Sequence, residues 1–74
     1  MSRPPVVKAS ELVKTLKKLG FVNTRRAGSH FFFKHTDGRT TVVPVHQGKS
    51  VGLGLMRGIL SDIKMSTEEL KKHL

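Results

Sequence analysis

The pattern of apolar residues predicts an α+β domain, in which one helix precedes a three-stranded antiparallel meander and two further helices follow it. The first observation is a helical repeat of apolar residues over 9–19. The second is a strand-like stretch over 21–45, rich in phenylalanine and β-branched residues. The third is another helical repeat over 53–63, followed by a helix-start signal for a short helix over 67–73. At 74 residues the chain is expected to form a single domain, 1–74.

The first helix is expected over 9–19, after a flexible lead-in at 1–8 whose paired prolines resist regular structure. Ser10 is a suitable N-cap residue, and Gly20 is suited to end the helix because it tolerates a left-handed backbone. The helix has one apolar stripe, formed by Leu12, Val13, Leu16 and Leu19.

The meander over 21–45 divides into three expected strands: Phe21–Arg26, Ser29–His35 and Arg39–Val45. Gly28 permits the first turn, and the Asp37-Gly38 pair predicts a two-residue turn for the second hairpin. Alternation along the middle strand gives two sets of side chains, His30 with Phe32 and Lys34, and Phe31 with Phe33 and His35. Because both sets contain phenylalanine, the pattern leaves open which face meets the helices.

The second helix is expected over 53–63, with Leu55, Met56, Ile59, Leu60 and Ile63 in its buried stripe. Gly58 lowers helix propensity by about 1 kcal/mol relative to alanine, so we expect packing to require its small size. The sequence from Ser66 to Glu69 is a capping box that opens the short helix over 67–73. Two leucines of this helix are expected to face inward, Leu70 and Leu74.

A three-stranded meander with helices before and after it is expected to carry both long helices on one face of the sheet. The opposite face is then open to solvent or to a partner. This is the architecture of the double-stranded-RNA-binding fold. The fold alone does not specify the function.

The charge of the chain favours acidic partners. Fourteen lysines and arginines stand against five acidic residues, which gives a formal net charge of +9. Such a surface attracts RNA, DNA or an acidic protein. With no cysteine there is neither a disulfide nor a thiolate metal site, as suits a reducing compartment. No apolar run is long enough to span a membrane and the start lacks a signal-peptide core, so we expect a cytoplasmic protein without membrane contact.

Histidines are the residues most suited to acid–base chemistry here. The chain has four, His30, His35, His46 and His73. Their scattered spacing argues against a metal site, and no cofactor motif is complete. His30 is the strongest candidate because Gly28 can form a turn that presents it at the rim of the sheet, where it could move protons near neutral pH. A His30 side chain buried in the core would instead be structural.

The chain resembles the HicA family of bacterial messenger-RNA interferase toxins. The resemblance runs from Ser10 to about Ile63 and depends on the order and spacing of several motifs: Ser10-Glu11-Leu12-Val13-Lys14, Gly20-Phe21, Gly28-Ser29-His30, Lys34 to Arg39, Val43-Pro44-Val45-His46, Lys49, Gly54 and Arg57 to Leu60. It implies a double-stranded-RNA-binding-like fold, ribonuclease activity on mRNA, and an inhibiting antitoxin of the HicB family. The family's catalytic histidine, in its Gly-Ser-His motif, corresponds to His30. Two stretches depart from the family pattern, the more aromatic Phe31–Phe33 and the glycine-rich Val51–Leu53.

These residues suit metal-independent RNA cleavage, in which the neighbouring 2′-hydroxyl is the nucleophile. His30 is then the general base or a proton shuttle, and His46 a possible second proton-transfer group. Lys34 and Lys49 are candidates for phosphate contact, with Arg25, Arg26 and Arg57 as weaker ones. Phe32 could stack a base if it lies on the open face.

Two other functions fit the same composition. The first is a non-catalytic RNA-binding module of the double-stranded-RNA-binding fold, although such modules carry a lysine cluster at the start of the second helix, where this chain has mainly glycine and Lys49 nearby. The second is an interaction protein whose basic face only docks an acidic partner. Cleavage of RNA that depends on His30 distinguishes the proposed enzyme from both.

Overall fold

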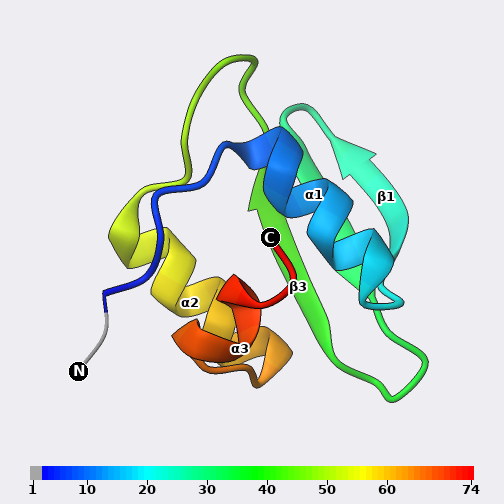
Figure 1. The fold of residues 1–74 in the computed structure, drawn as a ribbon. Coiled ribbons are helices and arrows are strands. Elements are labelled where there is room, and N and C mark those ends of the chain that lie inside the picture. Colours follow the sequence, from blue (N-terminus) through cyan, green and yellow to red (C-terminus); the bar gives the residue numbers. More distant parts are fainter. Residues whose placement is uncertain (1–2) are drawn as a thin grey trace.

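The computed structural model describes residues 3–74 as an α+β fold of the double-stranded-RNA-binding type (Figure 1). Its elements are α1 (Ala9–Lys18), β1 (Val22–Ala27), β2 (His30–Lys34), β3 (Thr40–Pro44), α2 (Leu53–Ile63) and α3 (Thr67–Lys71). The strands form one antiparallel sheet in the order β1-β2-β3. Helix α1 contacts β1 and β3, and α2 contacts β3. The predicted element order and fold class are confirmed.

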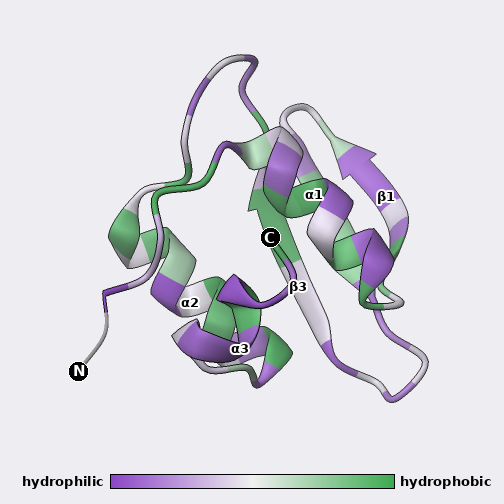
Figure 2. Cartoon of the chain, in the orientation of Figure 1, coloured by the Kyte–Doolittle hydropathy of each residue, from purple (hydrophilic) through white to green (hydrophobic). Residues whose placement is uncertain are grey.

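The burial of alternate residues identifies the face of the sheet that meets the helices. Phe33 in β2 is 1% exposed and Val43 in β3 is fully buried. Val43 pairs with Phe31, so both phenylalanines lie on the helix-covered face. Phe32 belongs to the other set, and the face that carries it is open. The hydropathy colouring in Figure 2 shows that the edge strand β1 is largely hydrophilic, which disfavours pairing with another sheet.

The lead-in expected over residues 1–8 is held against the fold at its end next to α1, although Val6 is 75% exposed. Val7 is buried, and its carbonyl accepts a hydrogen bond of 2.8 Å from the Val51 N–H. Lys8 forms an isolated antiparallel bridge with Ser50. The first two residues lie outside the described part. The segment before α1 is therefore paired with the loop before α2, a contact that local sequence does not encode.

That contact also sets where α1 begins. The residue before the helix is Lys8, which is extended and forms no side-chain cap. The Ala9 N–H donates to the Lys49 carbonyl at 3.1 Å, so a distant backbone group satisfies this helix end. The prediction of Ser10 as the N-cap is therefore wrong. The end of α1 agrees with the prediction, because Gly20 follows it with a φ of 95°.

The two hairpins differ in their turns. The β1–β2 turn has Gly28 at a φ of 59°, a conformation that glycine adopts without strain. In the β2–β3 hairpin the His35 N–H donates to the Arg39 carbonyl at 2.8 Å, which leaves the three residues 36–38 in the loop. Gly38, with a φ of 97°, closes it. The predicted two-residue turn is wrong, because the glycine serves as the left-handed third residue of a longer loop.

Gly58 lies on an exposed side of α2. A Cβ atom built there meets no other heavy atom within 4 Å, so the expectation that packing requires glycine is wrong. We expect Gly58→Ala to raise the free energy of unfolding by about 0.4–1 kcal/mol, because alanine restricts the unfolded chain and suits a helix. Urea denaturation followed by circular dichroism measures the change.

Gly38 is the matched control, because a Cβ there also meets nothing within 4 Å but its φ is 97°. Gly38→Ala is expected to lower stability by about 1–2 kcal/mol through backbone strain alone. A loss of stability in Gly58→Ala would show that the helix face needs the glycine after all.

The capping box of α3 is confirmed. The Ser66 Oγ accepts from the Glu69 N–H at 3.1 Å, and Glu69 Oε1 accepts from the Ser66 N–H at 3.0 Å. This backbone hydrogen bond lowers the pKa of Glu69 below its ordinary value. Leu70 is fully buried, as expected, whereas Leu74 is 44% exposed. The inward prediction for Leu74 is wrong, because α3 ends before it.

Candidate functional site

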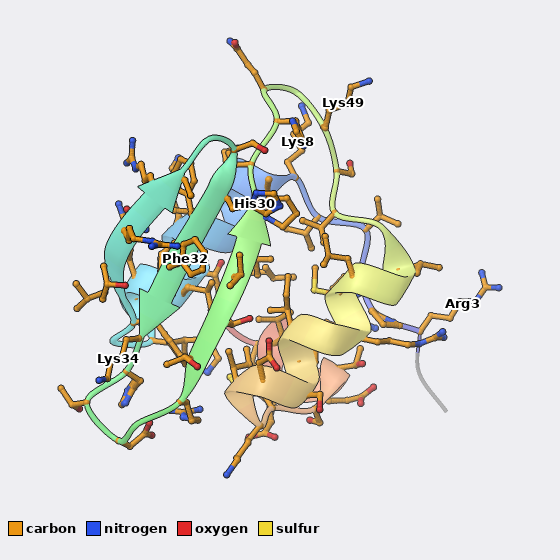
Figure 3. The ribbon with its side chains drawn as sticks, turned by 180° about the vertical axis from the view of Figure 1, so that it is seen from behind. Arg3, Lys8, His30, Phe32, Lys34 and Lys49 are labelled. Carbon is orange, nitrogen blue, oxygen red and sulfur yellow. The ribbon has the colours of Figure 1, made fainter. Side chains whose placement is uncertain are left out.

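His30 lies on the open face at the rim of the sheet. It is the first residue of β2, follows the Gly28 turn and is exposed to solvent. Its neighbours across the strands are Ala27 and Pro44, which are small or half-buried. Figure 3 shows its side chain at one end of the sheet, and that of Lys34 at the other. The imidazole is therefore accessible to a large substrate and is not a core histidine.

The chain after β3 continues along the same rim. The Val45 N–H donates to the Ser29 carbonyl at 2.7 Å, one step beyond the pairing of His30 with Pro44. His46 follows directly, beyond the end of the β2–β3 pairing, and its carbonyl begins the next turn. The second histidine predicted from the sequence therefore lies in the chain segment that leaves this rim.

A tight turn then brings Lys49 back to this rim. The Lys49 N–H donates to the His46 carbonyl at 3.0 Å, and Gly48 between them has a φ of 72°, as a type II turn requires. The bridge between Lys8 and Ser50 places a second lysine beside it. In Figure 3 Lys8 and Lys49 lie at the same end of the sheet as His30. We did not predict Lys8, because it precedes the first helix and joins the site only through a long-range bridge.

A β-bulge decides which arginine reaches the open face. The register of β1 shifts between Asn23 and Arg25, so that Arg25 pairs with Phe32. The Arg25 guanidinium carbon lies 4.4 Å from the centre of the Phe32 ring, a cation–π contact. Arg25 is thus on the open face, two residues along β1 from the partner of His30. Phe32 lies on the open face too, but the arginine covers part of its ring.

The other predicted cations lie further from His30. Lys34 is four residues along the same strand, about 13 Å at the usual rise, so it can contact only a different phosphate. Arg26 stacks on Phe31 with 4.3 Å between the guanidinium carbon and the ring centre, and Phe31 belongs to the helix-covered face. Arg57 is exposed on α2, outside the sheet. The residues at the rim are therefore His30, Arg25, Lys8 and Lys49, and His46 begins the turn that carries Lys49.

His35 is part of a structural network on the other side of the sheet. Its ring packs edge-on against Phe21, with 5.0 Å between ring centres. Its Nδ1 accepts from the Asp37 N–H at 3.2 Å. The Arg39 backbone N–H donates to the Asp37 carboxylate at 3.1 Å, and this bond lowers the pKa of Asp37. Arg39 also donates to the Ile63 carbonyl, which ties the hairpin to the end of α2.

Over residues 3–74, no cluster of three or more histidine and acidic side chains is placed to hold a metal ion. In the same part of the chain no helix has the length and apolarity to cross a membrane.

Comparison with known proteins gives one family. The sequence model of one protein family, the HicA toxin of bacterial toxin–antitoxin systems, matches residues 9–65. This range contains most of the chain and all the rim residues except Lys8. A search of curated proteins finds no significant match.

Proposed function

The chain belongs to the HicA toxin family of bacterial toxin–antitoxin systems, and we propose that it is a metal-independent endoribonuclease acting on mRNA in the cytoplasm. The observation that carries this proposal is the exposed His30 on the open face, at the same end of the sheet as Lys8 and Lys49 and near the Arg25–Phe32 contact. A family whose members are toxins implies an antitoxin partner. We propose that this partner is of the HicB family.

His30 begins the reaction as a general base. Its neutral imidazole takes the proton of a ribose 2′-hydroxyl, and the 2′-oxygen attacks the adjacent phosphorus. The P–O5′ bond breaks as the new P–O2′ bond forms. The products are a 2′,3′-cyclic phosphate on one fragment and a 5′-hydroxyl on the other. His46, in its protonated form, supplies the proton that the 5′-oxygen needs on leaving.

The cations at the rim stabilise the phosphate while it is pentavalent. Arg25 is held in place by the Phe32 ring, and the turn after β3 holds Lys49 beside Lys8. Fixed positive charges aimed at the developing negative charge are a large source of rate enhancement in enzymes. Lys34, at the far end of β2, contacts a neighbouring phosphate of the same RNA strand.

The antitoxin in this proposal is acidic and covers the open face. The chain carries a formal net charge of +9, so a partner of opposite charge is favoured at the same surface that binds RNA. Inhibition then follows from simple competition for the rim. If the protein bound an antitoxin but had no ribonuclease activity, it would instead be an interaction protein whose basic face only docks an acidic partner.

The wild-type protein tests the proposal directly. Purified protein incubated with single-stranded mRNA in excess chelator is expected to shorten the RNA and to leave 2′,3′-cyclic phosphate ends, detected by end-specific ligation. Binding should also weaken steeply with salt, because several phosphates are contacted. A shift of intact RNA on a native gel, with no shortening after long incubation, would identify a non-catalytic binding module and contradict the proposal.

A further inference from the structure

A recess lies beyond His30 at the β3 edge of the sheet, where residues of the open face meet Asp62 of α2. Its volume is about 440 Å³, within the usual range for small-ligand pockets. It is lined by Thr24, Phe32, Phe33, Lys34, Thr40, Thr41, Val42 and Asp62. Phe32 is two residues from His30, about 7 Å along the strand, so the recess begins one short step from the proposed cleavage point. The mechanism above uses Phe32 and Lys34 of this lining, but assigns no role to Asp62 or to the space between these residues.

Asp62 gives this recess a character different from the rest of the face. It is the one acidic residue in the lining, whereas the rim around His30 carries cations. A carboxylate repels phosphate, so an RNA strand would direct its backbone towards Lys34 and not against Asp62. A carboxylate instead accepts hydrogen bonds from N–H groups, as acidic side chains do from base amino groups.

The carboxylate is also held in position. Asp62 Oδ2 accepts a hydrogen bond of 2.9 Å from the Thr41 hydroxyl, which is buried in the core. Asp62 is itself exposed, and the structure shows no protein hydrogen bond to its Oδ1 among residues 3–74. One oxygen is therefore fixed, while the other remains available to a ligand.

The rest of the lining fits a flat ring. Phe32 and Val42 supply apolar surface, and Lys34 and Thr40 supply polar groups at the same recess. Aromatic surfaces stack unpaired RNA bases, and polar side chains read their edges. We propose that this recess holds one nucleobase adjacent to the cleaved bond, and that Asp62 selects bases with an exocyclic amine over uracil. The proposal rests on the ribonuclease activity proposed above.

The test compares base frequencies near the cut sites. A random single-stranded RNA library is digested, and the cut ends are sequenced. At one position beside the cut we expect uracil to be depleted about tenfold relative to the bases that carry an amine, the effect of one charge-assisted hydrogen bond. Asp62→Asn is expected to reduce the depletion to about twofold or less, because an amide lacks the charge. The readout is a ratio within each reaction, independent of total rate.

Two controls sharpen the result. Glu11→Gln makes the same change of charge on α1, which covers the other face of the sheet, and should leave the preference as in the wild type. An analogue test needs no variant: with adenine at the mapped position, replacing it by purine, which lacks the amine, should slow wild-type cleavage about tenfold.

The outcomes separate the two proposals. Absence of cleavage by the wild type would overturn the ribonuclease proposal, and this inference with it. Cleavage with no base preference, a preference unaltered by Asp62→Asn, or equal rates for adenine and purine would overturn the nucleobase recess alone. Asp62→Asn keeps an oxygen that can accept from the Thr41 hydroxyl, and a thermal melt checks that it folds.

Discussion

Replacing His30 by alanine is expected to lower the rate of RNA cleavage by about 10²–10⁴-fold, the usual contribution of a positioned acid–base group. The loss follows because the 2′-hydroxyl would have no base at the rim. The imidazole is exposed on the open face, so its removal takes little from the core. Single-turnover cleavage of a labelled RNA, with variant in excess over substrate, measures the rate. Thermal denaturation is expected to be nearly unchanged.

His73→Ala is the matched control. His73 is exposed and lies beyond α3, outside the sheet, so its loss should leave both cleavage and stability close to wild type. Expression of each protein in a bacterium should agree with the cleavage rates. The wild type and His73→Ala should arrest growth, and His30→Ala should allow normal growth. A folded His30→Ala protein that cleaves RNA at the wild-type rate would remove His30 from the catalytic role.

Local patterns in the sequence were enough to predict the succession of helices and strands. Gly20, Gly28 and the Ser66 capping box each specify a turn or a helix end by their own backbone chemistry, and the structure has all three. The start of α1 was not predictable in this way. It depends on hydrogen bonds to residues 49–51, which lie far along the chain, and these override the cap signal at Ser10.

The candidate site was only partly visible in the sequence. Gly28-Ser29-His30 identified the histidine, but its exposure depends on which side of β2 the helices cover. The two arginines of β1 could not be told apart either, since the bulge after Asn23 puts Arg25 on the open face and leaves Arg26 on the other. Alternation along a strand no longer predicts which face a side chain occupies once a bulge adds a residue. No motif or pattern in the sequence indicated that Lys8 would lie at the site.

Phe33→Ala tests the assignment of the two faces. The Phe33 side chain is 1% exposed, and truncating a buried phenylalanine costs about 3–5 kcal/mol. A core of this size supplies only about 3–5 kcal/mol of net stability, so the variant is expected to be largely unfolded at 25 °C. Circular dichroism and proton NMR, which would show collapsed amide dispersion, measure this outcome.

Phe32→Ala removes the same side chain from the neighbouring residue and is the internal control. Phe32 is half-buried on the open face. The substitution therefore removes only a partly buried side chain and its contact with Arg25. The contact is worth about 0.5–1 kcal/mol at an exposed site, and the total loss should stay near 1–2 kcal/mol. The variant should therefore fold. Equal destabilisation by the two substitutions would mean that both faces of β2 are covered, and a face covered by the protein itself could not admit an RNA strand to His30.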